Sequence, residues 1–150
     1  MIDAIGATAR WTAAARARES ERPDRLFADP LAHSLAGAEG FALLDAEPKE
    51  SQGNPYLPIR TRFFDDWLER VTEQHSVRQI VFVAAGMDTR TFRLSWPNGT
   101  TLWELDRPAL LDLKGTTLAA AGAVPARRSR TSRRDTGCTS PSHRRRPSPR

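Results

Sequence analysis

The sequence predicts an α/β fold of the doubly wound, Rossmann-like kind, of which this chain would carry the N-terminal part. Helix-forming segments fill the first 75 residues, and two β-rich segments follow at 77–85 and 100–106. A turn and short helical segment follows the first β-rich segment, and a longer helical segment follows the second. The apolar residues of the first are continuous rather than alternating, which is typical of a parallel strand buried on both faces. This order of helices and strands predicts two parallel strands with their helices.

The N-terminal third of the chain predicts helices separated by breaks. Residues 8–20 are rich in Ala and Arg and predict one helix. Residues 25–37 predict short helices interrupted at Pro30 and ended near Gly37. Residues 45–58 contain three prolines and predict a loop.

The clearest helical signal covers residues 58–74. Ile59, Phe63, Trp67 and Val71 recur every four residues, and Phe64 with Leu68 widens this stripe. This spacing places them on one face of a helix, and we expect that face to pack on the core.

The second half of the predicted fold follows the strand at 77–85. Residues 95–99 predict a turn, and residues 100–106 predict a second strand that ends in an acid. Residues 108–121 predict a helix, although Gly115 weakens it by about 1 kcal/mol relative to alanine.

The last 25 residues differ from the rest in composition. Residues 126–150 contain nine arginines and one aspartate, a net charge of +8, whereas residues 1–125 carry a net charge of −3. All the aromatic residues lie in the first 125 residues. A segment this polar cannot bury enough apolar surface to offset its ordering entropy. We therefore expect a folded part at 1–125 and a disordered basic tail at 126–150.

Targeting and redox signals are few. Cys138 is the single cysteine, so the sequence allows no internal disulfide and no multi-cysteine metal site, and we predict no metal centre. The longest apolar run is far shorter than the ~20 residues that span a bilayer. No secretory signal is visible at the N-terminus. The expected location is the cytoplasm, with no membrane partner.

A candidate ligand site lies where the first predicted strand ends. Ala84, Ala85 and Gly86 are small, so a ligand can approach the backbone closely. Asp106 stands twenty residues after Gly86, a distance at which an acid can accept hydrogen bonds from the hydroxyls of a nucleoside ribose. Glu104 is the neighbouring candidate, and its side chain should share the face of Asp106. A single glycine favours a nucleoside ligand whose phosphates need no cradle.

Two of these acids have structural alternatives. Asp106 precedes the helix at 108–121 and is also placed to cap it. Asp88 and Thr89 are placed to cap the short helix after the first strand.

Four blocks in this order resemble one family of methyltransferases. The blocks are TARWTAAARARESERPDRLFADPLA, LPIRTRFFDDWL, VAAGMDTRTFRL and WELDRPALLDLK, between about Thr8 and Pro125. They resemble the leucine carboxyl methyltransferase-like group of S-adenosylmethionine-dependent methyltransferases, and in particular its actinobacterial, mycobacterial-type branch. The resemblance implies S-adenosyl-L-methionine as cofactor and a small-molecule methyl acceptor, of which a carboxylate is one candidate.

The resemblance also implies roles for single residues. Ala84, Ala85 and Gly86 occupy the family's Gly-x-Gly turn, with Ala84 where the wider family often has glycine. Asp106 matches the ribose-binding acid. Arg60 or Arg62 resembles the arginine that pairs with the cofactor carboxylate, a partner that suits a guanidinium because it can form two hydrogen bonds to it. We favour Arg60, and the other arginine is then a solvated charge on the helix face. Methyl transfer depends mainly on positioning, so we name no catalytic residue.

The chain departs from the family after about Pro125. Family members continue with further strands, whereas this sequence continues into the basic tail. One hypothesis is that the tail is an out-of-frame reading of a GC-rich gene. We expect the resulting fragment to be truncated, marginally stable and impaired in cofactor binding.

Two other functions compete with this prediction. Clustered arginines in the tail attract phosphates, so a non-enzymatic nucleic-acid-binding fragment is one alternative. The tail has no aromatic residue for stacking, which argues against it. An NAD-type Rossmann protein is the other alternative, and the absence of a Gly-x-Gly-x-x-Gly motif argues against that.

Overall fold

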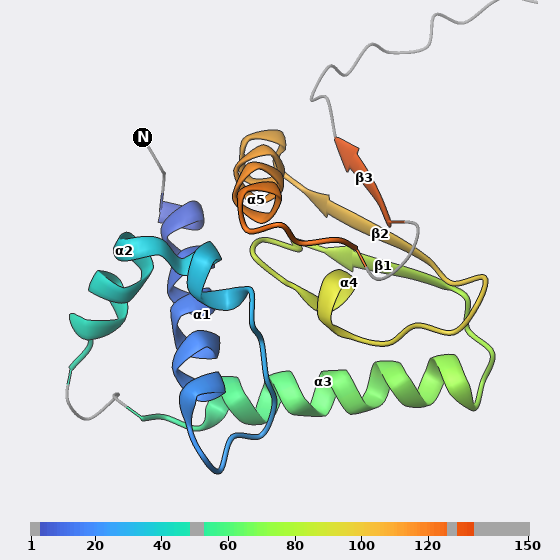
Figure 1. Cartoon of the computed structure of the whole chain (residues 1–150), viewed down its shortest axis with the longest axis horizontal. Coiled ribbons are helices and arrows are strands. Elements are labelled where there is room, and N and C mark those ends of the chain that lie inside the picture. The colour runs from blue at the N-terminus through green and yellow to red at the C-terminus, as the bar shows by residue number, and fades with distance from the viewer. Residues whose placement is uncertain (1–3, 49–52, 126–128, 134–150) are drawn as a thin grey trace, which may run out of the picture.

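The computed structural model of the protein describes residues 4–48, 53–125 and 129–133. Two paired helices stand beside a small sheet, and a long helix runs along both (Figure 1). Within the described ranges, no helix combines the length and apolarity that crossing a bilayer would require. The elements, in chain order, are α1 (Ala4–Glu21), α2 (Ala32–Asp45), α3 (Tyr56–Glu73), β1 (Gln79–Val83), α4 (Arg90–Arg93), β2 (Thr101–Asp106), α5 (Pro108–Ala120) and β3 (Ser129–Arg133).

The sheet confirms the predicted parallel pairing of the first two strands. The strand order is β1-β2-β3, and both pairs are parallel. Ile80 pairs with Leu102, and Trp103 pairs with Arg130. This order, helices followed by parallel strands, matches the N-terminal part of a Rossmann-like fold.

Strand β3 was not expected from the sequence. It occupies residues 129–133, inside the segment that we expected to be disordered. Its sequence, SRTSR, has no apolar residue, so its composition gave no strand signal. This segment forms a strand through backbone pairing with β2, which its side chains do not predict. The rest of the tail, 126–128 and 134–150, lies outside the described residues.

The described elements cover only one face of the sheet. Ile80 and Leu102 point to the face on which Leu68 of α3 packs. Val81 and Val83 point to the other face and are 52% and 76% exposed. The expectation that this strand is buried on both faces is therefore wrong for the described chain, because no described helix lies on the second face.

Helix α3 confirms the predicted helix, but of the predicted apolar stripe only the edge at Leu68 is buried. Its buried residues are Thr61, Asp65, Leu68 and Thr72. The predicted apolar stripe is largely exposed, with Ile59, Phe63 and Trp67 at 55%, 62% and 46%. The buried face instead carries Asp65, which pairs with Arg90 and Arg93, and Leu68, which packs on the sheet.

Helices α1 and α2 pack closely and carry one hydrophobic core. Ala13, Ala14, Leu35 and Ala36 are fully buried between them. The expected stop near Gly37 is a kink instead, with Gly37 at a φ of 57°, and the helix resumes to Asp45. Arg10 Nη1 donates to the carbonyls of Leu35 and Ala36, which are freed at this kink, at 3.4 and 3.2 Å.

Candidate functional site

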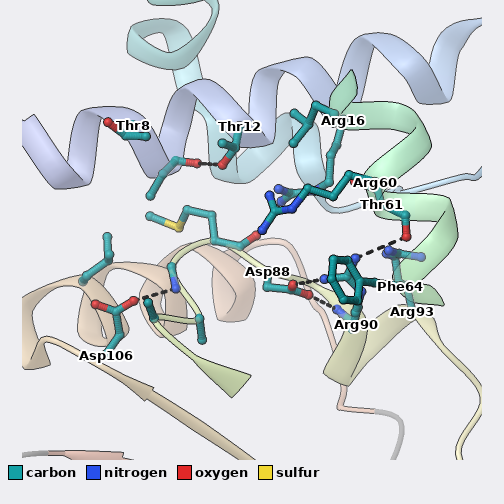
Figure 2. A pocket seen from close by; sticks show the side chains of 17 residues that line it. Thr8, Thr12, Arg16, Arg60, Thr61, Phe64, Asp88, Arg90, Arg93 and Asp106 are labelled. Atoms are coloured by element: carbon teal, nitrogen blue, oxygen red, sulfur yellow. Dashed lines mark hydrogen bonds and ion pairs between the residues drawn. The ribbon is translucent and has the colours of Figure 1, made fainter. Parts of the chain in front are cut away.

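A cavity of about 420 Å³ opens at the carboxyl ends of β1 and β2. Helix α1 and the first half of α3 form its other walls (Figure 2). Ligands of open α/β sheets bind at this edge, since the loops that leave the strands diverge there. The lining consists of Thr8, Ala9, Thr12, Arg16, Leu57, Arg60, Thr61, Phe64, Ala84, Ala85, Gly86, Met87, Asp88, Arg90, Arg93, Asp106 and Leu110.

The turn after β1 has an unusual backbone. Ala84 and Gly86 both have positive φ, at 54° and 49°. For Ala84 this left-handed conformation is strained, since a Cβ crowds the following carbonyl. A Cβ on Gly86 would meet the Cβ of Ala9 at 3.5 Å and the Ala84 carbonyl oxygen at 4.0 Å, which are ordinary contacts, so conformation rather than space favours glycine there. Both predicted turn residues line the cavity.

Asp106 lies at one side of this cavity and fixes the turn (Figure 2). Its Oδ2 accepts a hydrogen bond from the Gly86 N–H at 2.7 Å, and its Oδ1 accepts one from the Arg107 N–H at 2.7 Å. The helix cap of α5 is Arg107, and it makes no side-chain cap bond. Asp106 thus lines the cavity and does not cap α5 in the usual way, because it binds the N–H of the cap residue and not one inside the helix.

Glu104 is placed away from the cavity. It is 4% exposed, and its two carboxylate oxygens accept hydrogen bonds from Thr91 Oγ1 at 2.7 Å and Lys114 Nζ at 2.8 Å. Glu104 and Asp106 are two apart in β2 and share a face of the sheet as expected, but Glu104 is not among the residues that line the cavity. At the end of β2 the Asp106 carboxylate binds the turn after β1, whereas Glu104 binds Thr91 of α4 and Lys114 of α5.

The two candidate arginines of α3 differ in their surroundings. Arg60 lines the cavity and is 5.9 Å from the Phe64 ring centroid, in a cation–π contact. Arg62 lies outside the lining, pairs with Asp66 at 2.8 Å and donates to the Leu26 carbonyl at 3.2 Å. Among the described residues, Arg60 has no carboxylate partner. The geometry therefore favours Arg60, the residue preferred from the sequence.

A buried ion pair ties α1 to the floor of the cavity. Arg16 Nε donates to Asp29 Oδ2 at 2.9 Å, and Arg16 Nη2 donates to the Met87 carbonyl at 2.6 Å. Thr89 Oγ1 also donates to Asp29 Oδ2, at 2.6 Å. These bonds hold the loop after β1 against α1, and they leave Arg16 neutralised.

A second charge cluster joins α3 to α4. Arg90 and Arg93 both bind Asp65, at 2.7 Å from Arg90 Nε and 2.7 Å from Arg93 Nη1. Arg90 also pairs with Asp88, whose Oδ1 accepts the Arg90 backbone N–H at 2.8 Å. Burial alone would raise the pKa of Asp88, but the charges of Arg90 and Arg16 lower it below its ordinary value. Asp88 is therefore both a cavity residue and, as expected, a partner of the α4 terminus.

Sequence reasoning missed three residues of the lining. Thr8, Thr12 and Arg16 come from α1, one helical turn apart. In a helix rich in Ala and Arg, one buried arginine is indistinguishable from its exposed neighbours. Their spacing of four places them on one face of the helix, but that spacing does not indicate a binding site unless the surface that this face meets is known.

Comparison with known proteins supports a family assignment. Residues 9–140 match the model of the leucine carboxyl methyltransferase family, and this range extends past residue 125 and includes β3. A protein of Parafrankia sp. (strain EAN1pec) is 49% identical over 130 residues, which cover 81% of this chain and 41% of that protein. A Mycobacterium avium protein is 42% identical over 139 residues, which cover 85% of this chain and 45% of the relative.

The names of these relatives are consistent with one another. Each contains the phrase "Putative S-adenosyl-L-methionine-dependent methyltransferase", as does the name of a Saccharopolyspora erythraea protein that is 41% identical over 128 residues. The chain spans less than half the length of these relatives. With a family match over residues 9–140 and a cavity at the expected edge of a parallel sheet, the chain belongs to the leucine carboxyl methyltransferase family.

Proposed function

We propose that this chain carries the cofactor site of an S-adenosyl-L-methionine-dependent methyltransferase, in the cavity between α1, α3 and the ends of β1 and β2. The observation that supports it best is the distribution of charge. Arg16, Arg90 and Arg93 are all paired with buried or half-buried aspartates. Arg60 and Asp106 remain as a cation and an acid that face the same cavity from different elements (Figure 2).

This pair matches the two polar ends of the cofactor. The Arg60 guanidinium suits the methionine carboxylate, because a fork of N–H donors binds two carboxylate oxygens at once. Asp106 has lone pairs left for ribose hydroxyls after it accepts the Gly86 and Arg107 N–H groups. Gly86 and Ala84 would lie beside the methionine part, in a turn without a phosphate cradle.

The cofactor supplies the methyl group, and this chain's residues position it. When bound, S-adenosyl-L-methionine would supply an electrophilic methyl group for the acceptor, and Arg60 and Asp106 would hold the cofactor by its carboxylate and its ribose. Holding the two reactants in line accounts for most of such an acceleration. We therefore propose positioning roles only, and assign no catalytic base.

Isothermal titration with S-adenosylhomocysteine tests the site. Binding should weaken about tenfold or more in Arg60→Ala and in Asp106→Ala, the loss of about 1.4 kcal/mol expected for one charge-assisted contact. Arg62→Ala is the matched control and should bind like the parent chain. Equal binding by NAD, or an Arg62→Ala loss as large as that of Arg60→Ala, would contradict the proposal. Binding of duplex DNA that is lost on deleting residues 126–150 would favour the nucleic-acid alternative.

We also propose that these 150 residues bind the cofactor more weakly than a full-length relative. The open sheet face at Val81 and Val83 leaves apolar surface in water, which lowers the stability of the strand that carries the turn. Parallel titrations of this chain and of the Parafrankia relative test the point. Equal dissociation constants would show that the open face does not matter for binding.

A further inference from the structure

A second cavity, of about 680 Å³, lies against the face of α1 that neighbours the proposed cofactor site. Its walls are α1, the described residues that flank the α2–α3 connection, and the first turn of α3. Trp11, Leu26, Leu44 and Ile59 supply much of its apolar lining. A cavity of this size suits a small molecule, since ligand pockets span roughly 300–1,000 Å³.

Leu57 lies between the two cavities. It is a lining residue of both. Elsewhere α1 separates them, because Thr12 and Arg16 face the cofactor site whereas Trp11 and Ala15 face the second cavity. A molecule in the second cavity therefore approaches the first at the start of α3, beside Arg60 and Phe64.

The second cavity is lined by two arginines, Arg18 and Arg22, and by three acids, Glu19, Asp24 and Glu47, so two positive and three negative charges give its lining a net charge of −1. Arg18 pairs with Asp45, and Arg22 pairs with Asp24 at 2.8 Å. Glu19 is buried, accepts the Leu26 N–H at 2.7 Å and lies 3.7 Å from Arg22. Each lining arginine already has a carboxylate partner, and the excess of acids in the lining disfavours an anionic ligand because like charges repel.

We infer that the second cavity binds the methyl acceptor, and that this acceptor is an uncharged molecule with an apolar body. The inference rests on the proposed function of the neighbouring cavity. The apolar body would lie against Trp11 and Leu44, and the nucleophilic end would point past Leu57 to the cofactor methyl group. An acceptor of this class differs from the carboxylate that the family name suggests.

The probe for this test is 2-naphthol, with 2-naphthoate as a charged molecule of similar size. Both are titrated calorimetrically at pH 7 into the full 150-residue chain. Two variants carry the same substitution at different places. Ala15→Phe fills the second cavity, and Ala120→Phe adds a phenyl ring at an exposed position of α5.

The expected result is that 2-naphthol binds the parent chain and Ala120→Phe alike, and that Ala15→Phe weakens binding about tenfold or more. Circular dichroism checks that Ala15→Phe retains the parent helix content; if it does not, Ala15→Leu, a smaller filling change, takes its place. The inference is overturned if 2-naphthoate binds as well as 2-naphthol, if neither binds, or if the filled variant binds 2-naphthol unchanged.

Titration with S-adenosylhomocysteine separates the two proposals. Cofactor binding without 2-naphthol binding overturns this inference alone, and the reverse result overturns the proposed function.

Discussion

Asp106 Oδ2 accepts the backbone N–H of Gly86 at 2.7 Å, and this bond joins the end of β2 to the turn after β1. The carboxylate that we propose for the ribose therefore also sets the shape of the turn beside it. The two roles are compatible, because each carboxylate oxygen accepts more than one hydrogen bond.

Asp106→Asn should lower both stability and cofactor affinity. An asparagine keeps one acceptor oxygen but replaces the other with an NH₂ group, which cannot accept from Gly86 or Arg107. A lost hydrogen bond to a charged group costs about 1.5–3 kcal/mol. Urea unfolding measures the stability, and titration with S-adenosylhomocysteine measures the affinity. A variant that unfolds with the parent chain would show that the Gly86 bond is not needed for the turn.

Ala84→Gly should stabilise the chain. The left-handed conformation costs a non-glycine residue about 1–2 kcal/mol, and the extra freedom of glycine in the unfolded chain offsets about 0.5–1 kcal/mol of this. A gain of up to about 1 kcal/mol corresponds to a rise in Tm of roughly 2–4 °C for a chain of this size. Ala85→Gly is the control: Ala85 is buried and its φ is not positive, so this change should lower the Tm.

Gly40→Ala and Gly115→Ala should change stability in opposite directions. A Cβ at Gly40 would lie 2.5 Å from the Arg10 carbonyl oxygen, so α1 and α2 would have to move apart. Overpacking of this kind costs about 1–3 kcal/mol. A Cβ at Gly115 of α5 meets nothing within 4 Å, and alanine there should add about 1 kcal/mol of helix propensity. Urea unfolding of both variants measures the difference, and a loss at Gly115 would contradict the packing of α5.

Asp88 should contribute stability that is lost in acid. Its pKa is lowered in the folded chain, chiefly because Arg90 and Arg16 outweigh the effect of burial. A lowered pKa gives stability that is fully present above the unfolded value, about 3.9, and is lost as the pH falls through the folded value. Asp88→Asn should therefore be less stable than the parent at pH 7, and the difference should shrink below about pH 4. Urea unfolding from pH 7 to pH 3 tests this, and a constant difference would contradict the pairing with Arg90.

The pattern of apolar residues predicted which segments become helices and strands, but not which faces become buried. The segment 77–85 contains β1, and the helix expected at 58–74 is α3 within two residues at each end. Periodicity also predicted the stripe of Ile59, Phe63 and Trp67, but it could not predict that Asp65 on another face would bind Arg90 and Arg93. An ion pair between residues 25 or more positions apart leaves no trace in local sequence.

The sequence by itself determined the parallel pairing of β1 with β2, the turn at Ala84 and Gly86, and the acid twenty residues later. These features are local, since strand propensity, small residues at a turn and the length of one crossover fix them. Only the tertiary structure decided the rest. It placed Asp106 in the cavity lining and Glu104 outside it, and likewise Arg60 inside and Arg62 outside. It also brought Arg16 to the cavity floor and paired the polar strand β3 with β2. Each of these choices depends on which charges and backbone groups meet across the fold, and no spacing along the chain records that.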